Sequence, residues 1–404
     1  MLELLDILVV GFSICIIIVT KLLDRHPAPI LGIYQRPNGL YWVKAWFMYT
    51  VLSLRKLLKK EETDFTHLEK PQKLSHHEKA IDAVYLNGAN HLGDHLVVGT
   101  ARRKHLLVDG FLYLKICSSG LGVLETPKLP GTALYKTEES NEYDAEGVKI
   151  TPLEPMRKWR LTYRGKMKEN RDRSKIHDVA IDAVWTSDLP WFDYDTDMDP
   201  LCMAKSMAYE KWNRTYFDVL KANHQSHYEQ FGVLKASVVI DGVNFDTLLD
   251  TVRDHSFSVH REWRQFKRYG LHFFSAENGD RFSLGKVCLP VTFSRLTIGY
   301  VYSAEDDKIH AVQDCDLELF QHGELGTPPK DYAFSFTAGG KTYTVKVNVV
   351  DSPHFYISKD WEAKVFERLC RFEVNGVQGW GAAEWQYRNI QGKNVSDYSN
   401  LEME

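Results

Sequence analysis

The sequence predicts a mostly antiparallel β protein, on two observations. From Ala80 onward, apolar and polar residues alternate with the period of two that is typical of half-buried strands. Turn-forming pairs separate these runs at Asp241-Gly242, Asn278-Gly279 and Gly339-Gly340, and Asn-Gly between two strands is a strong hairpin signal. Strands at this spacing, without a repeating strand–helix rhythm, indicate antiparallel sandwiches or barrels rather than a Rossmann-type sheet.

The individual elements follow from the same patterns. Helical spacing is expected in two places within the body, 199–222 and 361–369. The expected strands, with a hairpin inside 271–283, are 95–102, 106–116, 159–165, 179–186, 233–240, 271–283, 287–303, 310–319, 332–337 and 341–350.

Composition limits the class of protein. A chain of 404 residues with 26% charged and 44% hydrophobic residues is long enough for two or three globular domains. A formal net charge of −4 gives no sign of a nucleic-acid partner, which usually selects a strongly basic surface. The six cysteines form no CxxC pair, so we expect free and mostly buried thiols.

The N-terminus carries a predicted transmembrane helix. Residues 7–20 contain no charge, and the apolar stretch reaches 4–23 if Asp6 and Lys21 extend towards its ends. That length suffices to cross a hydrocarbon core of ~30 Å. An acidic flank before it, a basic flank after it and no small-residue cleavage site favour an uncleaved anchor over a signal peptide.

Residues 40–60 predict an amphipathic helix lying in the membrane interface, because they are rich in Trp and Tyr and basic at their end. A second membrane span is the alternative, interrupted by Lys44. Residues 61–79 are polar and predict a linker or surface helix. Lys21 and Arg25 place the body in the cytosol by the positive-inside rule, against two sequons at Asn213 and Asn394 that only a lumenal body would use.

Familiar catalytic motifs are absent from the sequence. It contains no GxGxxG, GxxxxGK[ST], HExxH or GxSxG, which argues against common nucleotide, zinc-protease and serine-hydrolase sites. His91 and His95 would share a helix face, but Gly88 and Gly93 indicate a loop instead, so no metal site is expected there. We therefore expect neither a cofactor nor a metal.

The densest chemistry lies in 224–263. In a strand, alternate residues share a face, so His227 and Glu229 lie together, Asp254 lies with Ser256 and Ser258, and Arg253, His255 and Phe257 take the opposite face. A carboxylate near imidazole and guanidinium groups can serve as a general acid or base. Three alternatives stay open: a reactive site, a ligand-orienting site, or a buried ion network of Arg253, Arg261, Asp254 and Glu229 that closes a barrel end or a domain seam.

These residues resemble a known superfamily. HYEQFG at 227–232, a strand and a DG turn, then RDHSFSVHREW at 253–263 and the Gly-rich strand 374–388 are similar to lipocalin-like carotenoid 1,2-hydratases (hydroxyneurosporene synthases) and AttH-type proteins, most of all to the animal members. The resemblance covers about residues 80–390. It implies tandem lipocalin-like (calycin) barrels with an apolar cavity, in a superfamily that includes polyene hydratases and fungal cyclases.

The resemblance also implies roles for single residues. An aspartate of the hydratases protonates a C=C bond, which by motif position is Asp254, with His255, His227 and Glu229 around it. Tyr228 and Trp263 would form the cavity wall, and we assign Arg253, Phe257 and Arg261 with them to ligand binding. The chain departs from the motif at Leu249-Asp250-Thr251-Val252, where the family has Gly-x-Gly, and at Phe257 and Ser258, where it has Trp and Gly.

Together these observations predict an anchored protein with lipocalin-like domains at 80–245 and 246–404. Its partners would be the lipid bilayer and a long hydrophobic small molecule, such as an isoprenoid, sterol or fatty-acyl compound. The protein would be a cofactor-free hydratase, cyclase or isomerase, or a lipid carrier or sensor. We expect a single-pass protein of the endoplasmic reticulum membrane with a cytosolic body, and the oligomeric state stays open.

Overall fold

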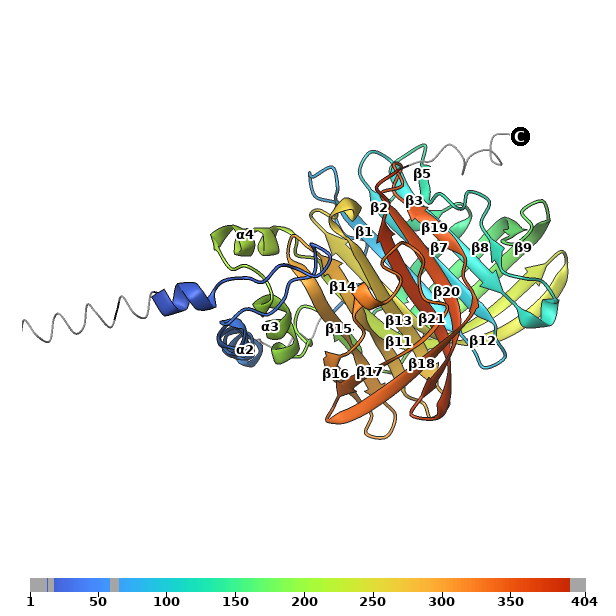
Figure 1. Cartoon of the computed structure of the whole chain (residues 1–404). Coiled ribbons are helices and arrows are strands. Elements are labelled where there is room, and N and C mark those ends of the chain that lie inside the picture. The colour runs from blue at the N-terminus through green and yellow to red at the C-terminus, as the bar shows by residue number, and fades with distance from the viewer. Residues whose placement is uncertain (1–12, 14–17, 59–64, 393–404) are drawn as a thin grey trace, which may run out of the picture.

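The computed structural model describes residue 13 and residues 18–58 and 65–392. Within these ranges the chain is mostly antiparallel β, as the sequence predicts, and it forms two closed eight-stranded barrels. Figure 1 shows the barrels packed against each other, with the helices α2, α3 and α4 gathered at one side. The five described cysteines are free.

The first barrel closes because β9 pairs with both β8 and β11. Its strands in order around the barrel are β11 (Ser226–Ile240), β12 (Val243–Ser258), β1 (Ile81–Ala89), β2 (His95–Arg103), β3 (Leu107–Lys115), β4 (Leu124–Glu125), β8 (Lys158–Glu169) and β9 (Ile176–Thr186). Four short strands extend this sheet: β5 (Ala133–Tyr135), β6 (Tyr143–Ala145), β7 (Val148–Glu154) and β10 (Trp191–Asp193).

The second barrel closes through the pairing of β18 with β20. Its strands in order are β18 (Lys341–Asp351), β17 (Asp331–Ala338), β16 (Lys308–Cys315), β15 (Phe293–Ser303), β14 (Arg281–Leu289), β13 (Arg268–Ala276), β21 (Val377–Arg388) and β20 (Ala363–Val374). The short strand β19 (His354–Ile357) pairs with β20. The predicted Asn278-Gly279 turn joins β13 to β14, with Gly279 at a positive φ of 93°.

The first barrel extends past the predicted domain boundary at 245. Strand β12 was assigned to the second domain, but it pairs with β11 and β1 of the first sheet along its length. The tight turn at Asp241 and Gly242, both with positive φ, folds β12 directly back on β11. The Asp-Gly turn therefore marks a hairpin within the first barrel and not the boundary between the two barrels.

The helices differ from the prediction in two places. The expected helix 199–222 is two helices, α3 (Pro200–Ala208) and α4 (Arg214–Ala222), because the side chain of Asn213 accepts a hydrogen bond from the Tyr216 backbone N–H and starts a new helix. The expected helix at 361–369 is wrong, since these residues mostly belong to β20. Short 3₁₀ turns are η1 (Cys117–Ser119), η2 (Trp263–Gln265) and η3 (Leu319–Gln321).

The N-terminal predictions are only partly covered. The predicted transmembrane segment 4–23 lies mostly outside the described residues, and no described helix combines the length and the apolar character that crossing a bilayer requires. The predicted helix 40–60 is present as α2 (Tyr41–Leu58). Of the predicted linker 61–79, residues 65–72 are not a free surface segment, because Leu68 and Glu69 contact His255 and Arg253 of the first barrel.

The alternation of side chains places one core inside each barrel and a third apolar layer between them. Leu234 and Trp185 belong to the first interior, and Phe274 and Trp385 belong to the second. The outward faces meet in a seam where Val97 and Tyr113 of the first barrel pack with Phe355 and Leu369 of the second. The seam is where the outward-facing residues of β11 and β12 come to lie.

Candidate active site

The outward faces of β11 and β12 bring three predicted residues together. Glu229 and Asp254 are direct register partners on the two strands, and His227 lies one step diagonally away on the same face. The His227 Nε2 atom is 3.4 Å from Glu229 Oε1 and 3.5 Å from Asp254 Oδ2. Glu229 is buried, whereas the side chains of His227 and Asp254 keep 27% and 18% of their surface exposed.

The charges of this cluster set the protonation of His227. Burial alone lowers the pKa of His227, but the nearby carboxylates of Asp254 and Glu229 outweigh it and raise the pKa to about 9. His227 therefore carries a proton at neutral pH. The ring of Tyr194 stacks on the imidazole with centroids 4.5 Å apart, which fixes its orientation.

A large apolar pocket reaches His227. It has a volume of about 1200 Å³ and is lined by α2, α3 and α4 on one side and by β14 and β15 of the second barrel on the other. Its wall includes Met48, Leu52, Met203, Leu220, Phe293 and Ile298, and the polar residues that line it include Arg55, Tyr194, Asp195, His224 and His227. A pocket with mostly apolar walls is suited to a hydrophobic small molecule, and the polar groups on its wall can orient that molecule.

The opposite face of the same two strands points into the first barrel. There Arg253 Nη1 lies 2.8 Å from the Oε1 atom of Glu69, which also accepts a hydrogen bond from Tyr228 Oη at 2.7 Å. The indole N–H of Trp159 donates to Glu69 Oε2 at 2.5 Å. The Arg253 guanidinium also lies over the rings of Trp159, Trp185 and Tyr228. The segment 65–72 thus places the buried carboxylate of Glu69 against the inward face of the first barrel.

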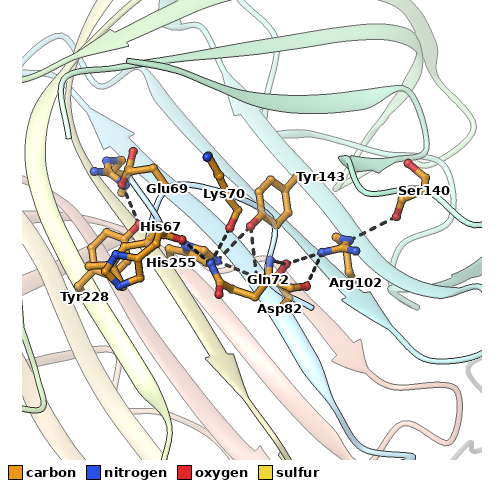
Figure 2. A network of polar contacts seen from close by, with 12 residues as sticks. His67, Glu69, Lys70, Gln72, Asp82, Arg102, Ser140, Tyr143, Tyr228 and His255 are labelled. Carbon is orange, nitrogen blue, oxygen red and sulfur yellow. Dashed lines mark hydrogen bonds and ion pairs between the residues drawn. The ribbon is translucent and has the colours of Figure 1, made fainter. Parts of the chain in front are cut away.

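His255 belongs to the same buried network (Figure 2). Its Nδ1 atom is 2.7 Å from the Leu68 carbonyl oxygen, and its Nε2 atom is 2.7 Å from Asp82 Oδ1. Arg102 donates to the other oxygen of Asp82 at 2.7 Å, and the hydroxyl of Tyr143 donates to Oδ1. Arg253, His255 and Tyr228 are therefore partnered inside the first barrel, away from the pocket.

The remaining predicted ligand residues also lie outside the pocket wall. Phe257 follows His255 on the inward face, with ring centroids 5.3 Å apart. Arg261 is buried, its Nε donates to Gln225 Oε1 at 2.7 Å, and burial lowers its pKa to about 10. Trp263 lies in η2 with its ring 5.4 Å from that of Phe266, a pocket residue. Of the nine predicted site residues, His227 lines the pocket, and Glu229 and Asp254 contact His227.

The predicted ion network is accordingly split between two faces. Arg253 pairs with Glu69 inside the barrel, whereas Asp254 and Glu229 pair with His227 outside it. The outer cluster also meets the geometric condition for holding a metal ion, since one ligand atom from each residue lies within 4.8 Å of the others. This possibility was missed at the sequence level, because the three ligands lie on two strands.

Sequence reasoning missed most of the pocket. Glu69 lies in a segment that the sequence predicts to be a linker or surface helix. An acidic residue among other polar residues carries no signal of burial, so its contact with Arg253 could not be foreseen. Tyr194 and the apolar residues of α2, α3 and α4 come from three separated stretches of the chain. The amphipathic pattern of α2 was a usable signal for a helix with one face packed, but not for what it packs against.

Comparison with known families gives one assignment for the whole body. A family model described as a family of unknown function, DUF8627, matches residues 8–387. The chain belongs to this family. A comparison with curated proteins finds no match for this DUF8627 member.

Solved structures share the fold of this DUF8627 protein at low identity. A protein assigned as an AttH from Nitrosomonas europaea superposes with a TM-score of 0.52 at 9% identity, over 82% of this chain and 98% of its own. Kievitone hydratase from Nectria haematococca gives 0.49 at 10% identity, over 81% and 97%. CghA with Sch210972 gives 0.46 at 9%, over 77% and 89%. The AttH similarity supports the predicted lipocalin-like fold, while the similarity to animal members stays a prediction.

Proposed function

We propose that this protein is an acid–base enzyme that hydrates, cyclises or isomerises a long hydrophobic molecule containing a C=C bond. The supporting observation is the meeting of an apolar pocket of about 1200 Å³ with the His227–Glu229–Asp254 cluster. A protonated imidazole facing an apolar ligand can donate its proton to carbon, and aromatic rings such as Tyr194 can stabilise the cation that results.

The geometry alters the role that motif position gave to Asp254. Because His227 lines the pocket and carries a proton at neutral pH, we assign proton donation to His227. Asp254 and Glu229 hold the imidazolium in place and stabilise its charge. These roles follow from a general property of histidine: a neighbouring carboxylate orients the imidazole and favours its protonated form.

We further propose that the ligand arrives from a membrane at the endoplasmic reticulum, with the body on the cytosolic side. Supporting this, Trp42, Trp46, Phe47 and Leu54 on α2 are more than half exposed, while Met48 and Leu52 on the same helix line the pocket. Arg55 and Lys56 lie at the basic end of the helix, where they would meet anionic headgroups.

The test uses the full chain in mild detergent with a total membrane lipid extract from the source cells. Mass spectrometry compares bound and free lipids for wild type, His227→Gln and the control His310→Gln, whose imidazole pairs with Asp306 away from the pocket. We expect wild type and the control to form a product that differs by one water or is an isomer, and His227→Gln to keep the lipid bound and unchanged.

Two other results would contradict this proposal. The same lipid retained unchanged by wild type and His227→Gln would identify a non-catalytic carrier, which the apolar pocket alone would support. Equal product from both proteins would show that His227 takes no part in the chemistry.

A further inference from the structure

A second group of buried acids lies in the seam between the barrels. Glu367 on β20 and Glu384 on β21 are direct register partners on the outward face of the second barrel, and their carboxyl groups hydrogen-bond to each other. Glu367 is completely buried and Glu384 is half-buried. The largest influences on the two carboxyl groups are burial and the neighbouring acids and tyrosines.

Two tyrosines supply the other contacts of the pair. The hydroxyl of Tyr269 donates to Glu384 Oε1, and the hydroxyl of Tyr85 lies 3.3 Å from both carboxyl oxygens of Glu367. Burial first, and then the charge of Glu384, raises the pKa of Glu367 well above its usual range, and burial likewise raises the pKa of Glu384. Two adjacent buried carboxyl groups strongly oppose each other's ionisation, so the pair holds a proton.

This acid pair lies next to the site described above. Tyr85 on β1 is the direct register partner of Asp254 on β12, so the two side chains share the outward face. The charges of Asp254 and Glu229 also act on Glu384, which adds to the rise in its pKa. Tyr269 packs with Val287 and Leu289, which line the apolar pocket.

Buried polar side chains without hydrogen-bond partners lie close to this acid pair. Gln386 is the next outward residue on β21 after Glu384, and it faces Tyr269 in register. The side chain of Gln386 is completely buried, yet neither its amide nitrogen nor its amide oxygen has a hydrogen-bond partner, and the indole nitrogen of nearby Trp263 has none either. Buried amides are nearly always satisfied, so this arrangement suits a bound water or a ligand oxygen.

We propose that Glu384 is a second acid–base group beside the pocket, which accepts a proton from a water molecule held beside Gln386. The inference rests on the proposed function and narrows it to hydration. His227 donates a proton to one carbon of the C=C bond, and the water oxygen bonds to the other carbon. The water gives up one proton to Glu384, and Glu367 stabilises the added proton by sharing it. Glu384 then releases its added proton to solvent and His227 takes up one proton from solvent, so that one water is added and nothing is oxidised or reduced.

The shared proton is tested without any ligand, by the stability of the full chain as a function of pH. A carboxyl whose pKa is raised by folding destabilises the folded state increasingly as pH rises above its unfolded pKa of 4.5. Glu367→Gln removes this penalty. Its melting temperature relative to wild type should therefore rise between pH 5 and pH 8, whereas the control Glu373→Gln, on the same strand and paired with Lys346, should show no such trend. Parallel pH curves for Glu367→Gln and wild type would overturn the shared proton.

The catalytic role is tested with the lipid extract in H₂¹⁸O. We expect wild type and Glu373→Gln to form a product that carries ¹⁸O, and Glu384→Gln to lose at least about 100-fold in rate while it still binds the same lipid. Tyr269→Phe, which keeps the carboxyl, should lose less. Product formed without ¹⁸O, or formed equally by Glu384→Gln, would overturn this inference and leave the proposed function intact. No product from wild type would overturn both.

Discussion

At the scale of single residues, His227 couples the chemistry of the pocket to pH. Its pKa of about 9 lies above the ordinary value of 6.5, because two carboxylates outweigh the cost of burial. A histidine with a raised pKa stabilises the folded state fully below pH 6.5, and this contribution is lost as pH rises through 9. Turnover that depends on proton donation by His227 should likewise be lost as pH rises through about 9.

Substitution of Asp254 tests this coupling directly. Asp254→Asn removes one of the two negative charges near His227, so the pKa of His227 should fall by at least about one pH unit. Titration of isotope-labelled histidines by NMR measures the change, and His310 beside Asp306 serves as an internal control that should not move. If the His227 resonance titrates at the same pH in both proteins, Asp254 does not set its charge. Adding Zn²⁺ in the same experiment shows whether a metal displaces the proton.

At the scale of elements, α2 has two apolar faces with different roles. Tyr41, Ala45 and Met48 recur at helical spacing and are buried against α3 and its surroundings. Trp42 and Trp46 lie on the other side and are 57% and 54% exposed. An element that is apolar on both faces and basic at its end is typical of helices that contact a membrane surface.

Tryptophan fluorescence tests whether that face enters a bilayer. The chain has 10 tryptophans, of which Trp42 and Trp46 are the two that are exposed in the described residues. Vesicles containing anionic lipid with brominated acyl chains should quench the full chain, and the quenching should fall by more than half in the double variant Trp42→Phe and Trp46→Phe. Trp212→Phe, a half-buried residue beside α2, is the matched control. Undiminished quenching in the double variant would remove α2 from the membrane contact.

The elements also show what local patterns can predict. The hairpin at Asn278-Gly279 and the alternating faces of β11 and β12 follow from local chemistry, and the structure confirms them. The expected helix at 361–369 failed for a physical reason. Val365 of β20 faces the seam and Cys370 faces the second core, so both faces are buried and the sequence lacks the alternation that identifies a half-buried strand.

At the scale of the whole molecule, long-range contacts decide which face of a strand can be a site. The sequence places Arg253 and Asp254 on opposite faces but does not show which one meets a ligand. That depends on Glu69, a residue between α2 and β1 whose buried carboxylate pairs with Arg253 inside the first barrel. The pocket is likewise assembled from helices and from the second barrel.

The burial of Glu69 against Arg253 links the stability of this fold to its activity. Glu69 and Arg253 are 3% and 1% exposed, so Glu69→Ala leaves a buried guanidinium without its carboxylate and should cost about 3–5 kcal/mol in urea unfolding. Glu305→Ala, which breaks an exposed pair with Lys341, should change nothing measurable. Arg253 adjoins Asp254, and Tyr228 stands between His227 and Glu229. Loss of the Glu69 carboxylate should therefore also disturb the cluster of His227, Glu229 and Asp254 and slow turnover under conditions where the protein remains folded. Normal turnover with normal stability in Glu69→Ala would show that the interior network and the pocket are independent.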